Sequence, residues 1–94
     1  MAIVANFYAT LRPIVGSKRL ELPLEAGATV QQVLDYLVQR YPALRNELLD
    51  EHGNLYRHVH IFVNGRDVPY LEHGMNTPLT ASDVVDVFPA VAGG

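Results

Sequence analysis

The segment TVQQVLDYLVQRY, residues 29–41, is the most regular stretch of the chain and decides the fold class. Its apolar residues recur at the three- and four-residue spacing that places them on one face of a helix. Thr29 is a favourable N-cap, and Gln32 completes a capping-box pattern. Pro42 ends the helix, because a proline disfavours helical backbone in the residue before it. The predicted buried face consists of Val30, Val33, Leu34, Leu37, Val38 and Tyr41.

Two strands are expected before this helix. Residues 2–8 and 19–24 each alternate apolar and polar side chains, which is the pattern of a half-buried strand. The segment between them, residues 10–16, contains the turn formers Pro13 and Gly16. We therefore predict that the two strands form an antiparallel hairpin joined by a turn.

The chain just after the helix is expected to hold a further short helical turn and then a polar loop. Residues 43–49 place leucines at helical spacing, and residues 50–54 read DEHGN, which breaks that pattern. The loop is a candidate for mobility. The leucines expected to face inward are Leu44, Leu48 and Leu49.

Three more strands are predicted in the second half. Residues 58–64 alternate and end in Asn64-Gly65, a strong signal for a type I′ hairpin turn. A short return strand is expected over 66–68, followed by an irregular stretch. The β-branched run at 84–88 predicts a central strand that is covered on both faces.

This order, β-β-α-β-β-β, predicts an α+β protein of the β-grasp (ubiquitin-like) arrangement, a mixed sheet with one main helix on one face. The rival ferredoxin-like sandwich needs a second full helix, and residues 67–82 have neither helical period nor cap. We expect a single domain over residues 1–94 with a flexible C-terminal tail over residues 89–94.

Composition narrows the possible functions. The net charge is −3, and the seven Lys and Arg residues never cluster beyond the pair Lys18-Arg19, so a nucleic-acid partner is not expected. The chain has no Cys, which excludes disulfides and thiolate chemistry of its own. No stretch is long and apolar enough to span a bilayer, and the N-terminus lacks a signal-peptide pattern. A cytoplasmic location without membrane contact is the expectation.

The ending Pro89-Ala-Val-Ala92-Gly93-Gly94 is the strongest candidate site. An extended tail of this length reaches about 20 Å, and the small residues at its end could thread a narrow channel in another protein. The Gly94 carboxylate is ionised at neutral pH and can attack the α-phosphorus of ATP. Once adenylated, it can accept sulfide to become a thiocarboxylate, or a lysine amine to become an isopeptide. The alternative reading is a disordered end or the remnant of an expression tag.

Other candidate residues carry weaker signals. His58 and His60 lie two apart on one predicted strand face and could share a metal, but a solvated face is the simpler reading, and no metal is expected. Phe62 shares that face, either as a docking residue, together with Pro89, or as a partly covered packing residue. The sequence has no catalytic triad spacing, P-loop or nucleotide fingerprint, so we do not expect an enzyme.

The whole chain resembles the ubiquitin-like sulfur carriers, which include the small subunit of molybdopterin synthase and the thiamine sulfur carrier. The resemblance rests on Leu11-Arg12-Pro13, the helix, Phe62-Val-Asn-Gly65 and the Pro…Gly-Gly ending. Within the family, residues 57–64 and the ending look most like the carrier of an alternative cysteine biosynthesis. The longer segment between Ala43 and Arg57 departs from typical molybdopterin synthase small subunits.

This resemblance implies a mechanism and partners. An E1-like adenylyltransferase would use ATP to form the Gly94 thiocarboxylate, a pyridoxal-phosphate cysteine synthase would accept the sulfur, and a metalloprotease would release cysteine. The carrier itself would bind no cofactor. Molybdopterin, thiamine and tRNA thiolation are alternatives within the class. A protein modifier, for which Lys18 is the only lysine available for self-chains, and a plain binding domain are alternatives outside it.

Overall fold

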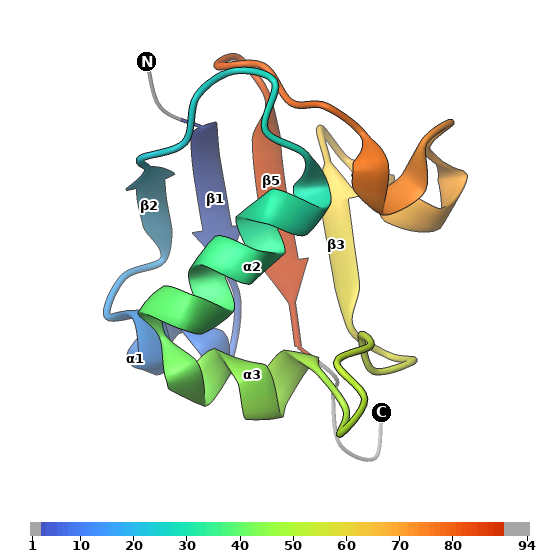
Figure 1. The fold of residues 1–94 in the computed structure, drawn as a ribbon. Coiled ribbons are helices and arrows are strands. Elements are labelled where there is room, and N and C mark those ends of the chain that lie inside the picture. The colour runs from blue at the N-terminus through green and yellow to red at the C-terminus, as the bar shows by residue number, and fades with distance from the viewer. Residues whose placement is uncertain (1–2, 90–94) are drawn as a thin grey trace.

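A computed structural model describes residues 3–89, and a five-stranded mixed sheet forms its centre (Figure 1). The strand order is β2-β1-β5-β3-β4, with β1 and β5 parallel and the other neighbours antiparallel. This is the predicted β-grasp arrangement, because the pair β1 and β2 and the pair β3 and β4 are joined in the sheet through the last strand, β5. The strands are β1 (Ile3–Phe7), β2 (Arg19–Leu22), β3 (His60–Val63), β4 (Arg66–Asp67) and β5 (Val84–Phe88).

The main helix α2 (Val30–Arg40) forms where the sequence predicts it. Its capping box is complete: the Thr29 hydroxyl accepts a hydrogen bond from the Gln32 backbone N–H at 3.2 Å, and the Gln32 side chain accepts one from the Thr29 N–H at 2.8 Å. These bonds satisfy two of the backbone donors that a helix start leaves without partners. The helix crosses one face of the sheet (Figure 1).

A second helix, α3 (Pro42–Leu48), follows directly and confirms the predicted helical turn. Pro42 ends α2, because a proline disfavours helical backbone in the residue before it. Pro42 also begins α3, because the first helical position needs no backbone N–H. Leu44, Leu48 and Leu49 are buried, as expected. The helices α2 and α3 thus form one layer on one side of the sheet.

The link between β1 and β2 differs from the prediction. A short helix, α1 (Leu11–Val15), occupies the segment expected to be a turn, so the two strands pair antiparallel without a tight hairpin. Pro13 lies in the first turn of α1, where backbone N–H groups have no helical partner, so its ring breaks no hydrogen bond. Gly16 ends the helix at φ 85°, a left-handed conformation that suits glycine.

The turn between β3 and β4 is as predicted, with φ of 51° at Asn64 and 84° at Gly65. The return strand ends at Asp67, one residue earlier than expected, because Val68 begins a 3₁₀ helix and the next residue, Pro69, has no N–H for a strand ladder. The stretch predicted as irregular contains two 3₁₀ helices, η1 (Val68–Tyr70) and η2 (Gly74–Asn76).

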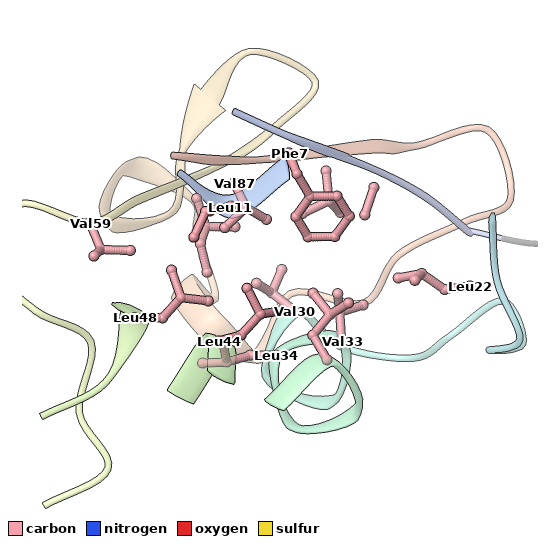
Figure 2. Close-up of a cluster of buried hydrophobic side chains, with 14 of the residues drawn as sticks. Phe7, Leu11, Leu22, Val30, Val33, Leu34, Leu44, Leu48, Val59 and Val87 are labelled. Atoms are coloured by element: carbon pink, nitrogen blue, oxygen red, sulfur yellow. The ribbon is translucent and has the colours of Figure 1, made fainter. Parts of the chain in front are cut away.

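The hydrophobic core lies between the sheet and the helices, where apolar side chains of both layers interdigitate (Figure 2). The central strand β5 contributes Val85 and Val87, which are each 1% exposed. The prediction that this strand is covered on both faces is wrong, since Val84, Asp86 and Phe88 are only half-buried. One face of the sheet is therefore packed, and the other is open to solvent.

Candidate docking site on the open face of the sheet

The open face is built by the residues that alternate with the core positions. In β1, Ile3, Ala5 and Phe7 point into the core, so the remaining side chains point the other way. The same alternation in β5 and β3 adds half-buried or exposed side chains next to them. From β1, the residue after it, β5 and β3, this face receives Val4, Asn6, Tyr8, Val84, Asp86, Phe88, His60 and Phe62.

Three aromatic rings meet on this face. The rings of Tyr8 and Phe88 stack with centroids 4.1 Å apart and an angle of 10° between their planes. Phe62 meets Phe88 edge-on at 5.4 Å and 85°. Both geometries are favourable for aromatic pairs. The cluster joins β1, β5 and β3, so its shape is set by the sheet rather than by a loop.

These rings line a shallow hollow of about 460 Å³, which we call the aromatic hollow. Its walls are mostly apolar carbon, with two imidazole rings on one side. Phe62 and Pro89, the two residues predicted to dock a partner, both lie in it, and Pro89 is buried. The residues that line it are Tyr8, Ala9, His58, His60, Phe62, Phe88 and Pro89.

Hydrogen bonds hold this cluster in place. One carboxylate oxygen of Asp86 accepts bonds from the Asn6 amide and the Tyr8 hydroxyl, both at 3.0 Å. The bond to Asp86 raises the pKa of Tyr8 above its ordinary value, because the carboxylate favours the neutral phenol that donates to it. On the far side, His60 Nδ1 lies 2.8 Å from Asp67 Oδ2. The hollow is thus preorganised on two sides.

The histidines do not gather into a metal centre. His58 and His60 both line the aromatic hollow, but His60 is engaged with Asp67, and residues 3–89 contain no group of three or more potential ligands suited to a metal. His52 and His73 each lie next to a glutamate in the chain and pair with that neighbour, at 3.5 and 4.0 Å. The side chains of the hollow offer apolar contact and hydrogen bonds, which suits binding.

The residues of the predicted tail, Ala92, Gly93 and Gly94, lie outside the described residues. The structure shows where the chain leaves the sheet towards them, because Pro89 follows β5 directly and lines the aromatic hollow. The sequence analysis did not identify Tyr8 and Phe88 as residues of the candidate site. Tyr8 and Phe88 lie side by side because β1 and β5 pair in parallel with Phe7 opposite Val87. This register could not be predicted from the sequence.

The strand order, the single helical layer and the open face define a ubiquitin-like β-grasp protein. The chain belongs to the ThiS family, whose model matches residues 5–94. The resemblance to ubiquitin-like sulfur carriers is thereby confirmed. Within the described residues, no helix combines the length and apolar character needed to cross a membrane.

The relatives carry two kinds of name. Small archaeal modifier protein 3 of Haloferax volcanii is 40% identical over 94 residues, with both chains fully covered. Sulfur carrier protein CysO of Mycobacterium tuberculosis is 32% identical over 96 residues, again with full coverage of both. Family members similar to this chain are therefore small carrier and modifier proteins.

Solved structures agree with the fold. The crystal structure of SAMP1 from Haloferax volcanii has a TM-score of 0.83 at 29% identity, with 100% of both chains covered. A chain in the BexX/CysO complex of Amycolatopsis orientalis has a TM-score of 0.77 at 30% identity, covering 99% of this chain and 100% of that one. That relative is thus seen in complex with another protein.

Proposed function

We propose that this protein is a sulfur carrier whose working group is the carboxylate of Gly94. The observation that carries the proposal is the aromatic hollow where Pro89 leads from β5 into residues 90–94. A partner that fills this hollow is anchored where the chain departs toward Gly94. The family and the names of the relatives support the same function.

The chemistry proceeds in two steps on a partner enzyme. The Gly94 carboxylate attacks the α-phosphorus of ATP, which forms an acyl-adenylate and releases pyrophosphate. Sulfide then attacks the acyl carbon, which forms a C–S bond and expels AMP. If the donor is a persulfide, its attack expels AMP and leaves an acyl disulfide, and a thiol of the partner enzyme then attacks the donor sulfur, which forms a new disulfide with the donor and releases the carrier sulfur. The product is a thiocarboxylate. In this scheme the protein binds no cofactor itself, and an E1-like adenylyltransferase supplies the catalytic groups.

We propose cysteine biosynthesis as the use of this sulfur, with a pyridoxal-phosphate cysteine synthase as acceptor and a metalloprotease that releases the product. The similarity to CysO over the whole chain supports this assignment. Molybdopterin synthesis, thiamine synthesis and tRNA thiolation are the alternatives within the same chemistry. An acceptor assay with each class of enzyme separates them, because only the correct acceptor consumes the thiocarboxylate.

A second candidate function is protein modification through an isopeptide bond. The 40% identity to a protein named as a small archaeal modifier favours it. An acyl-adenylate attacked by a lysine amine gives an amide and AMP, so both functions share the first step. Modification predicts conjugates of higher mass in cells, and these should disappear when Gly94 is deleted.

The test of the carrier function is intact mass after incubation with ATP, the activating enzyme of the same organism and sulfide. We expect a mass gain equal to the replacement of one oxygen by sulfur, located at Gly94. No gain with an enzyme that is competent on another carrier would contradict the proposal.

The Gly94→Phe variant should lose this mass gain, because a bulky side chain blocks a narrow channel around the carboxylate. Folding should be unchanged, since the core lies between Ile3 and Val87. Glu72→Phe, which adds the same side chain at an exposed position, is the control and should be activated normally. Normal activation of the Gly94→Phe variant would contradict the narrow channel around the terminal carboxylate.

A further inference from the structure

A second, smaller hollow of about 260 Å³ lies beside the aromatic hollow on the same face. Five residues line it: Asn6, Tyr8, Arg12, Lys18 and Arg19. We call it the basic hollow. Tyr8 lines both hollows, so they form one continuous surface with an apolar part and a positively charged part.

The fold brings three of the seven basic side chains of the protein to this place. Arg12 comes from α1, where its Nε donates to the Phe7 carbonyl at 2.8 Å and its guanidinium carbon lies 5.4 Å from the centre of the Tyr8 ring. Arg19 is paired with Asn6 across β1 and β2, which puts both on the open face. Lys18 precedes Arg19.

The basic side chains of this hollow form no ion pair within the described part of the chain. The ion pairs formed within residues 3–89 all use a histidine, so none of the three basic side chains is paired there. The Asp86 carboxylate keeps its negative charge, but its hydrogen bonds are to the neutral Asn6 amide and Tyr8 hydroxyl and not to a basic side chain. Glu21 lies on the same face further along β2. A protein of net charge −3 thus presents a local cluster of cations.

We propose that the basic hollow is the charged half of the docking surface and that it recognises an acidic segment of the partner protein. In that segment, an apolar side chain enters the aromatic hollow and neighbouring carboxylates meet Arg12, Lys18 and Arg19. This inference rests on the proposed function, because the partner is the activating enzyme. A nucleic acid is disfavoured, since the cations do not form a stripe along a backbone and the adjoining hollow is apolar.

Charges at the rim of an interface act mainly on the rate of association and on its salt dependence. The double variant Lys18→Gln/Arg19→Gln tests this directly. Arg12 is left in place, because its bond to Phe7 and its position over Tyr8 also support the fold. The control is Arg40→Gln/Arg45→Gln, which removes the same net charge from the exposed surface of the helical layer.

The readout is kcat/KM for activation between about 0.01 and 0.1 M ionic strength, over which the Debye length falls from about 30 to about 10 Å. We expect kcat/KM of the Lys18/Arg19 variant to be about five- to tenfold lower at low salt, with kcat unchanged, and to converge on the wild type at high salt. The control should keep the wild-type salt dependence. Equal behaviour of the two variants would overturn the inference, whereas a wild type that is never activated would overturn the proposed function instead.

A binding measurement tests the inference without relying on activation. The probe is a synthetic peptide with one Phe flanked by Glu residues, compared with the same peptide carrying Gln in place of Glu. We expect the Glu peptide to shift the backbone amide NMR signals around Tyr8, Arg12 and Arg19 in the wild type, and to do so much less in the Lys18→Gln/Arg19→Gln variant. Equal shifts from both peptides would overturn the inference.

Discussion

At the scale of single residues, Tyr8 connects the features of the open face. Its ring stacks on Phe88, its hydroxyl donates to Asp86, and the Arg12 guanidinium lies above it. One side chain therefore borders both the apolar and the charged half of the docking surface. A partner that contacts this ring meets both kinds of chemistry at once.

Phe62 is the residue whose truncation best separates docking from folding. Phe62→Ala removes one wall of the aromatic hollow, so we expect KM for activation to rise about tenfold, equivalent to about 1.4 kcal/mol. The free energy of unfolding should fall by only about 1 kcal/mol, because the ring is half-buried. Initial rates and urea unfolding measure the two effects.

The matched control for Phe62 is Tyr70→Ala. Tyr70 is an aromatic side chain that is 78% exposed and lies outside both hollows. Its truncation should leave KM and stability unchanged. A similar KM for the Phe62 and Tyr70 variants would show that the aromatic hollow does not bind the activating enzyme.

The site was only partly predictable at this scale. Phe62 and Pro89 were identified because an aromatic residue on a polar strand face and a proline after the last strand stand out locally. Tyr8 and Phe88 were missed, because their contact depends on the parallel pairing of strands about 80 residues apart. The basic hollow was missed for a different reason, because Arg12 reaches Lys18 and Arg19 only through helix α1, which was predicted as a turn.

At the scale of elements, a hydrogen-bonded link ties the β3–β4 turn to the start of β5. Asp83 accepts from the Thr80 backbone N–H at 2.7 Å and from the Asn64 amide at 2.8 Å. The Asn64 side chain in turn accepts from the Val84 N–H at 2.9 Å. These donors lower the pKa of Asp83, with the Thr80 backbone bond as the largest cause.

This lowered pKa predicts an acid-dependent loss of stability. A carboxylate with a depressed pKa in the folded state contributes stability above its unfolded pKa of about 3.9 and loses it as the pH falls through the folded value. Asp83→Asn should therefore lower the free energy of unfolding near pH 7 and flatten its dependence on pH below about 4. Urea unfolding at a series of pH values measures this.

The exposed helix residue Asp35 supplies the control, because Asp35→Asn changes the same charge without touching the link between elements. Its effect on stability at neutral pH should be small. If Asp83→Asn kept the full acid slope of the wild type, the hydrogen bonds to Thr80 and Asn64 would not be the source of that slope.

The elements themselves were predictable to different degrees. The helix α2 has both an apolar period and a capping box, so its start at Val30 follows from local chemistry. The short helix α1 was mistaken for a turn, because Pro13 and Gly16 are turn formers when judged alone. What forms the helix is the burial of Leu11 and Val15, one helical turn apart, which depends on the core above them.

At the scale of the whole molecule, a substitution at Leu37 tests whether the sheet and the helical layer unfold as one unit. It is 1% exposed, and Leu37→Ala should cost about 2 to 5 kcal/mol through lost contacts and a residual cavity. Small domains have only about 5 to 15 kcal/mol in total, so the variant should lose a large part of its stability. Urea unfolding followed by both circular dichroism and tyrosine fluorescence should show one coincident, shifted transition.

The half-buried neighbour Val38 is the control, and Val38→Ala should cost clearly less. Transitions that separate between the two probes in the Leu37 variant would mean that the sheet and the helical layer unfold independently.

The fold as a whole was predictable because strand periodicity, one capped helix and the Asn64-Gly65 turn leave few topologies. The exposure of the second face of the sheet was not predictable from the sequence. The β-branched run at 84–88 looks buried on both sides, but only the side toward the helices is packed, and the aromatic rings half-cover the other. An open face and a buried face can be built from equally apolar side chains, and only the placement of the helices decides between them.

The central position of β5 also bears on how the protein is made. A ribosome synthesises residues 84–88 after every other strand of the described sheet, yet this strand lies between β1 and β3, which do not pair with each other. The nascent chain thus cannot close its sheet until it has been translated through Phe88, and any product halted earlier lacks its centre. Under the proposed function, a folded copy is one whose translation has already come within a few residues of Gly94. Stalled fragments would be left to the proteases before they could occupy the activating enzyme.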